Sequence, residues 1–194
     1  NMDSEEQNQN ALGLQEIINL VKTKYFEGRF EKALDILDNL PIDLGSIDKI
    51  GRSRILQQRA KILYKTDRFQ EALTHYENAY SIIDEQWGED DLYTIIAKIR
   101  VFHVKIELGQ YKESKEGLER ILSKLHNLGQ ANSIAAAKAM YNLGIILTKI
   151  AHYEKALDVF QQSIDIFEKE GDQYKIDLAH TYQKIGRASC RERV

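Results

Sequence analysis

The chain has 194 residues, of which 43% are hydrophobic and 29% are charged, and its formal net charge is −3. This composition excludes an intrinsically disordered chain, and a single cysteine excludes a disulfide framework and a zinc site built on cysteines. The negative net charge does not indicate a nucleic-acid-binding protein, which would be rich in lysine and arginine. No apolar run approaches the ~18 residues of a membrane span. One proline in the whole chain favours long helices joined by short turns. We therefore expect a mostly helical protein of the reducing cytoplasm.

The two ends of the chain differ from its body. Asn1 before Met2 is typical of a residue left by tag removal, and residues 1–10 are polar, so we expect them to be disordered. Residues 187–194 (RASCRERV) break the pattern that precedes them, and we expect a non-native tail there. We therefore expect the folded body of the protein to span residues 11–186.

Apolar residues at helical spacing predict nine helices in this body. In the clearest example, Met140, Leu143 and Leu147 follow one another at i, i+3 and i+7, which places them on one face. Gly88 and Pro41 are typical of residues that end a helix. The predicted helices span residues 11–27, 30–40, 48–66, 68–86, 90–108, 111–127, 132–150, 153–169 and 174–186.

The helices are paired in a repeat of about 42 residues, which is the main signal in the sequence. The aromatic residue that opens each second helix recurs at Phe30, Phe69, Tyr111 and Tyr153, with spacings of 39, 42 and 42. The hinge within each pair is short, so its two helices are expected to be antiparallel neighbours. We divide the body into repeats at 11–47, 48–89, 90–131 and 132–173, followed by a partial fifth repeat at 174–186.

Residues 140–147 (MYNLGIIL), 153–157 (YEKAL) and 67–79 resemble the tetratricopeptide repeat. The resemblance covers residues 11–186 and implies an all-α fold, a right-handed superhelical solenoid of antiparallel helix pairs. The 42-residue period exceeds the usual ~34 residues; it is similar to the repeats of kinesin light chains and of Rap-like peptide-sensing regulators. The third repeat departs from the pattern, since Phe102 replaces a small residue and Gly117 lies within a helix, although Phe102 can compensate for smaller partners.

No sequence motif indicates an enzyme. Nucleotide-binding loops, a His-Glu-x-x-His helix and a Gly-x-Ser-x-Gly elbow are absent, and the five histidines are scattered. The acidic run at residues 89–91 is better explained as a helix N-cap than as a metal cluster. We predict no catalytic residue, no metal and no cofactor.

In the family that the chain resembles, the first helix of each pair lines a concave groove. The resemblance therefore implies a peptide-binding groove formed by Asn19, Lys22, Arg54, Gln58, Lys61, Lys65, Arg100, His103, Lys138, Tyr141, Asn142 and Lys149. Cations outnumber acids there, tyrosine and isoleucine side chains lie between them, and the asparagine at 142 matches one that bonds ligand backbone in relatives. This composition suits an extended or helical acidic peptide, although a solvated basic face is the alternative.

The leading hypothesis is a non-catalytic scaffold for protein–protein interaction that binds an acidic partner segment in this groove. The alternative is an intracellular peptide-sensing regulatory domain of the Rap-like type. The pattern of the fifth repeat stops after Gly186, so we expect the native protein to continue and the cut helix to allow self-association. A chaperone-tail clamp is disfavoured because its pattern is matched only at Arg100 or only at Lys138. We expect no nucleic-acid partner and no membrane insertion.

Overall fold

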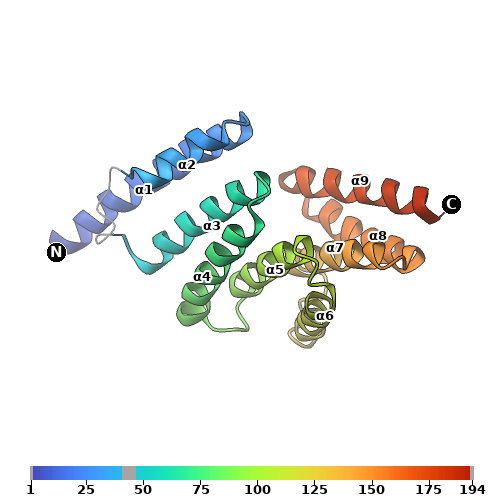
Figure 1. Cartoon of the computed structure of the whole chain (residues 1–194). Helices are drawn as coiled ribbons and strands as arrows, with labels where there is room; N and C mark the ends of the chain where they lie inside the picture. The colour runs from blue at the N-terminus through green and yellow to red at the C-terminus, as the bar shows by residue number, and fades with distance from the viewer. Residues whose placement is uncertain (1, 41–46, 193–194) are drawn as a thin grey trace. The chain divides into compact units, whose positions relative to one another are not determined.

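The computed structural model of the chain describes residues 2–40 and 47–192 (Figure 1). The chain divides into two compact halves, Asn1–Glu89 and Asp90–Val194, which we call the N-terminal half and the C-terminal half. Nine α-helices and one short 3-10 helix form the regular structure of the described residues, which contain no strand. This confirms the predicted all-α array of helix pairs.

Apart from three helix ends, the observed helix bounds lie close to the predicted ones. The N-terminal half contains α1 (Met2–Phe26), α2 (Phe30–Asp38), α3 (Lys49–Lys65) and α4 (Phe69–Trp87). The C-terminal half contains α5 (Leu92–Glu107), α6 (Tyr111–Asn127), α7 (Ile134–Lys149), α8 (Tyr153–Glu170), the 3-10 turn η2 (Asp172–Tyr174) and α9 (Lys175–Glu192).

Three helix ends differ from the sequence expectation. Helix α1 begins at Met2 and takes in residues 2–10, which were expected to be disordered. Helix α2 ends at Asp38, and Pro41, predicted to close it, lies outside the described residues. Helix α9 continues to Glu192 because no helix breaker follows Gly186 and the Ala188 side chain is fully buried.

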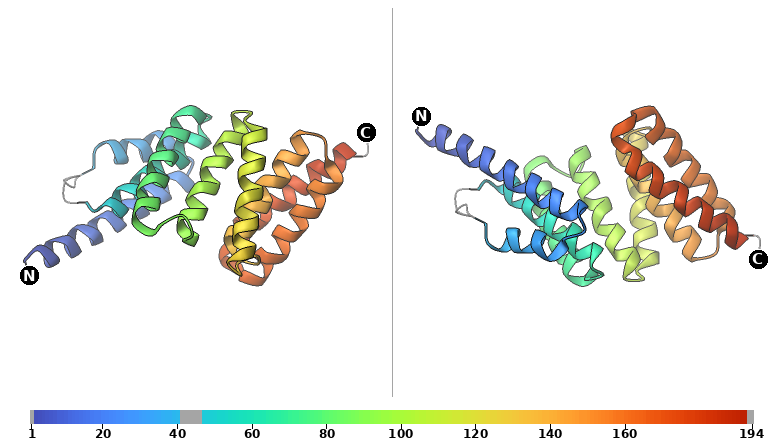
Figure 2. Two further views of the ribbon diagram at one scale, coloured as in Figure 1. Left: turned by 90° about the horizontal axis from the view of Figure 1, so that it is seen from below. Right: turned by 90° about the horizontal axis from the view of Figure 1, so that it is seen from above.

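The N-terminal half consists of the pairs α1–α2 and α3–α4, with α3 also packed against α1 and α2 (Figure 2). Ala33 and Ala72 are fully buried at the start of the second helices, where a small side chain lets the two backbones approach. Ile62 and Ile83, 1% and 0% exposed, fill the space between α3 and α4. Each alanine lies three residues after the repeated aromatic residue, at Phe30 and Phe69, so this position of the repeat is a close-approach position.

The C-terminal half has one continuous apolar core to which α5, α6, α7 and α8 contribute. Figure 2 shows α7, α8 and α9 lying side by side, in agreement with the contacts between them. Phe160 and Phe167 of α8 are among the largest fully buried side chains. The buried hydroxyl of Ser163 donates a 2.8 Å hydrogen bond to the carbonyl of Ala137, which ties α8 to α7.

Two helix pairs of this half pack with the large and the small residue exchanged. In the fourth repeat, Gly144 of α7 faces Phe160 of α8, and a Cβ atom at 144 would lie 2.5 Å from the ring. In the third repeat, Gly117 of α6 faces Phe102 of α5, and a Cβ atom at 117 would overlap that ring. The departure of the third repeat from the family pattern is thus a compensated one, because Phe102 fills the volume that its partner helix leaves.

Side-chain caps begin three of the first helices. Asp91 accepts hydrogen bonds from the backbone N–H groups of Tyr93 and Thr94 at 2.8 and 3.3 Å, which confirms that the acidic run at 89–91 caps a helix. Ser133 caps α7 and Asp48 caps α3 in the same way. Gly88, predicted to end α4, follows that helix with φ of 81°, a left-handed conformation that glycine adopts without strain.

Candidate functional site

The predicted groove residues lie on the first helices of the pairs. In the N-terminal half, α1 carries Asn19 and Lys22, and α3 carries Arg54, Gln58, Lys61 and Lys65. In the C-terminal half, α5 carries Arg100 and His103, and α7 carries Lys138, Tyr141, Asn142 and Lys149. Asn19, Lys22, Lys65 and Lys149 are exposed, Asn142 is buried, and the other residues are partly buried. Each half therefore presents its own portion of the predicted face.

A chain of polar contacts links α1 to α3 in the N-terminal half. The guanidinium of Arg54 donates to the side-chain oxygen of Gln15, and the Gln15 amide donates to Asn19 at 2.8 Å. Arg54 and Asn19 are therefore held by neighbouring side chains. Pairs across helices of this kind depend on packing and could not be predicted from the repeat alignment.

Lys61 is seated on aromatic rings. Its ammonium lies 4.3 Å from the centre of the Tyr25 ring and 5.3 Å from that of Phe26, within the range of a cation–π contact. Burial raises the pKa of Tyr25. Phe26 is 65% exposed, so the N-terminal half offers an apolar ring beside a cation. The sequence prediction included Lys61 but missed Phe26, which lies four residues after the predicted groove residue Lys22.

His103 and Asn142 are brought together in the C-terminal half. Nδ1 of His103 donates to Oδ1 of Asn142 at 2.6 Å, and the Asn142 side chain is only 3% exposed. The Tyr141 ring lies 6.3 Å from the His103 ring, centre to centre. The resemblance implies an open amide at 142; in this chain the oxygen of that amide is buried and engaged by a histidine.

His103 gives the chain a testable pH dependence. Burial lowers the pKa of His103, an effect that Lys184 and His180 reinforce and that the Asn142 hydrogen bond and Glu107 oppose. Below pH about 6.5 the unfolded chain takes up a proton that the folded chain resists, so the free energy of unfolding falls as the pH falls.

We expect the wild type to lose more stability between pH 7 and pH 5 than the variant His103→Gln, whose amide donates but does not titrate. Urea denaturation at the two pH values measures the difference. Equal losses in the two proteins would show that His103 does not titrate differently in the folded state.

Helix α9 adds two cations that the sequence prediction did not include. A cavity of about 100 Å³ is lined by Ile145, Thr148, Lys149, Lys184 and Arg187. Burial lowers the pKa of Lys184, and the positive charges of Arg187 and Lys149 lower it further, while Glu107 acts in the opposite direction. Lys184 and Arg187 lie 42 residues after Asn142 and Ile145, so extending the alignment into the fifth repeat would have found them.

Two features make the face less basic and less apolar than the residue types suggest. Lys138 forms a 2.7 Å ion pair with Asp177 of α9, so its charge is balanced within the protein. The isoleucines expected among the groove residues are core residues: Ile18, Ile99, Ile106 and Ile145 are 1–3% exposed. Burial, with Asp177 and Glu107, raises the pKa of Tyr141 to about 12, so its hydroxyl stays protonated at neutral pH.

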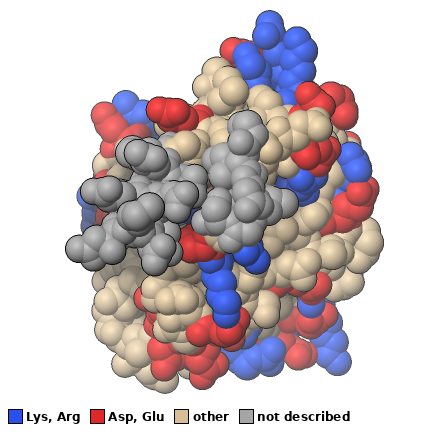
Figure 3. Space-filling view, turned by 90° about the vertical axis from the view of Figure 1, so that its left-hand side faces the viewer, with Lys and Arg blue, Asp and Glu red and all other residues tan. Residues whose placement is uncertain are grey.

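Charges are mixed elsewhere on the surface. On the face shown in Figure 3, acidic and basic side chains of the described residues are interspersed. Within the described part of the chain, no group of three or more histidine, cysteine, aspartate or glutamate side chains could hold a metal ion. No helix in residues 2–40 or 47–192 is long and apolar enough to span a membrane.

Comparisons with known proteins agree with this architecture. The sequence model of the tetratricopeptide repeat matches residues 103–169. No curated protein matches the sequence significantly.

Solved structures share the fold at low sequence identity. One is a structure of TPR-like repeats, nearly identical to one another, from a putative kinesin light chain of Podosopora anserina. It is 14% identical to this chain with a TM-score of 0.65, and the match covers 92% of this chain and 86% of that one. BtubC (BKLC) from P. vanneervenii is 16% identical with a TM-score of 0.64, covering 99% and 85%. The MamA RS-1 ArsTM double mutant is 19% identical with a TM-score of 0.53, covering 93% and 95%.

Stacked helix pairs of this kind present extended surfaces for binding other proteins. The sequence match lies in the C-terminal half, in the two repeats where Phe102 and Gly144 meet their partners. The chain therefore resembles tetratricopeptide-repeat proteins: the sequence match covers residues 103–169, and the fold is shared with solved repeat structures over 92% or more of the chain.

Proposed function

We propose that the protein is a non-catalytic interaction scaffold whose C-terminal half binds an acidic peptide segment on the face formed by α7 and α9. One observation carries the proposal: the cations of Lys149, Lys184 and Arg187 line one small cavity together with the hydroxyl of Thr148. A cytoplasmic location suits a chain with a single cysteine.

The electrostatics of this cavity favour an anion. Three like charges around a cavity of about 100 Å³ repel one another, and Arg187 and Lys149 add to the burial that lowers the pKa of Lys184. A carboxylate placed among them would remove the repulsion and accept charge-assisted hydrogen bonds. A cavity of this size suits the carboxylate of an aspartate or glutamate, since a water molecule's share of liquid volume is about 30 Å³.

Other groups on the first helices of this half set the character of the peptide. Arg100 and Lys149 are carried by α5 and α7, the two first helices that the His103–Asn142 hydrogen bond joins. The apolar floor is supplied by Tyr141, which is partly buried against Phe160, their ring centres 6.1 Å apart. A segment with an acidic residue beside an apolar one fits this arrangement.

The test uses Lys149→Glu combined with Lys184→Glu. The probes are fluorescein-labelled 12-residue peptides of one apolar pattern, with their variable positions all Glu, all Gln or all Lys. We expect the Glu series to bind most tightly and the double variant to weaken it by about tenfold, because each substitution replaces a cation with a charge of the same sign as the peptide's carboxylates. Fluorescence anisotropy measures the dissociation constants, and circular dichroism checks that helicity is unchanged.

The control is Lys155→Glu combined with Lys169→Glu, which makes the same charge change at exposed positions of the second helix α8. This control should bind the Glu series as the wild type does. Equal affinity for the Glu and Lys series, or an unchanged affinity in the Lys149 and Lys184 variant, would refute the proposed site.

A further inference from the structure

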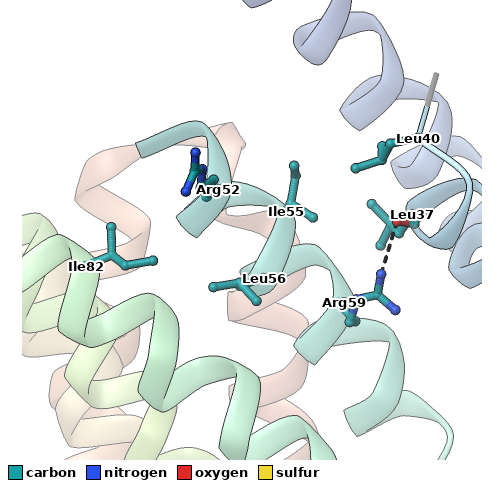
Figure 4. A pocket seen from close by; sticks show the side chains of 7 residues that line it. All are labelled: Leu37, Leu40, Arg52, Ile55, Leu56, Arg59 and Ile82. Atoms are coloured by element: carbon teal, nitrogen blue, oxygen red, sulfur yellow. Dashed lines mark hydrogen bonds between the residues drawn. The ribbon is translucent and has the colours of Figure 1, made fainter. Parts of the chain in front are cut away.

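The N-terminal half has an apolar pocket on a different side of α3 from the predicted groove. Its volume is about 590 Å³, and its lining consists of Leu37, Leu40, Arg52, Ile55, Leu56, Arg59 and Ile82 (Figure 4). The lining residues of α3 follow one another at i, i+3, i+4 and i+7 from position 52, so they share one helix face. The predicted groove residues of α3, at 54, 58, 61 and 65, form another face.

The pocket exists because α2 is short. Helix α2 has 9 residues, whereas the other second helices α4, α6 and α8 have 19, 17 and 18. Its last turn is bound to α3 by Arg59, whose guanidinium donates to the carbonyl of Leu37 at 3.0 Å. Among residues 2–40 and 47–192, α2 is the second helix that packs on α3 from this side, and it ends at Asp38.

The C-terminal half shows what fills the corresponding place. Two repeat periods, 84 residues, bring Arg52, Ile55, Arg59 and Ile82 to Ala136, Ala139, Leu143 and Ile166. All four of these residues are buried in the core to which Ile121 and Leu125 of α6 also belong. The second half of α6 therefore occupies, in its own repeat, the place that α2 leaves open.

The charges at the pocket differ from those of its counterpart. Where the C-terminal half has Ala136 and Leu143, the pocket has the two guanidinium groups of Arg52 and Arg59. Arg59 is paired with Asp38, whereas Arg52 is exposed and donates from Nε to the carbonyl of Ile47 at 3.1 Å. An apolar floor beside an exposed cation suits an amphipathic segment that carries an acidic residue.

We propose that this pocket binds an amphipathic helix of a partner protein, about two turns long, at the place that corresponds to the second half of α6 in the C-terminal half. Its large apolar residues lie at i, i+3 and i+7, as Leu118, Ile121 and Leu125 do in α6, and a carboxylate beside them meets Arg52. This interaction is independent of the groove proposed above. It uses another face of α3, together with residues of the second helices α2 and α4.

The probe is a synthetic peptide with the sequence of α6, Tyr111–Asn127, in which Lys115→Glu and Lys124→Glu make the polar side acidic. We expect saturable binding to the full chain, with methyl NMR shifts confined to Leu37, Leu40, Ile55, Leu56 and Ile82. Leu56→Lys in the chain should weaken binding by about tenfold or more, as should Ile82→Lys, because each places a charge in the apolar floor. Arg52→Glu should weaken the acidic peptide more than the unmodified one.

Leu20→Lys is the matched control, since Leu20 is a 47% exposed leucine of the same half outside the pocket. Thermal melts of the variants show that each is folded. Binding that survives Leu56→Lys and Ile82→Lys, or shifts centred outside the pocket, would overturn the proposal. Contacts of these methyl groups with residues 41–46 in the free chain, or self-association that Leu56→Lys abolishes, would assign the pocket to the chain itself and overturn it too.

Discussion

Replacing Phe160 with alanine is expected to lower the free energy of unfolding by about 3–5 kcal/mol, the usual cost of removing a buried phenylalanine ring. The ring is 0% exposed and lies against Gly144, where no side chain can move in to fill the space. It also contacts Tyr141, whose ring centre is 6.1 Å away. The cavity left by the substitution would therefore stay open in the middle of the C-terminal core.

Urea denaturation followed by circular dichroism measures this loss. Phe26→Ala is the control, because it removes the same ring from a position that is 65% exposed and should change the free energy of unfolding by far less. A loss for Phe160→Ala no larger than that of the control would mean that α7 and α8 are not packed as described.

The exchanged pair of the third repeat leads to the second large effect. Gly117→Leu is expected to destabilise the chain by about 1–3 kcal/mol or more, because its side chain must enter the volume of the Phe102 ring. Phe102→Ala should also destabilise the chain, by leaving a cavity. The two substitutions together should cost less than the sum of their separate effects by about 1 kcal/mol or more, since each relieves the strain or the void that the other creates.

A double-mutant cycle in urea measures this coupling. Gly186→Leu is the matched control, because no atom lies within 4 Å of a Cβ atom built at that helical glycine. It should be neutral or slightly stabilising, since leucine favours a helix more than glycine does. Additive effects of the two core substitutions would show that Gly117 and Phe102 are not in contact.

The helices and their pairing could be predicted because their signals are local. Apolar residues at helical spacing and glycines such as Gly88 mark elements without reference to the rest of the chain. The compensation at Phe102 was also open to sequence reasoning, since a large residue in one column and Gly117 in another suggested it. The early end of α2 is a different case: apolar residues continue through Leu40, while the helix ends at Asp38.

The candidate site could be predicted only as far as helix faces. The repeat alignment placed Lys149 and His103 on first helices, where the structure has them. It could not predict that Asn142 bonds His103, that Asp177 neutralises Lys138, or that Ile145 is buried, because these outcomes depend on which side chains meet across helices. The pocket beside α2 was also missed, since it arises where α2 ends at Asp38 next to α3.

The exchange of large and small residues between the third and fourth repeats also constrains how the sequence can change with time. Both arrangements fill the volume between the two helices. An intermediate sequence, in which only one of the two residues has changed, does not. A lineage that loses the ring at 102 first passes through a void, and one that enlarges residue 117 first passes through a clash. The two positions are therefore expected to co-vary among homologues, and a repeat profile that scores each column separately would undervalue the third repeat.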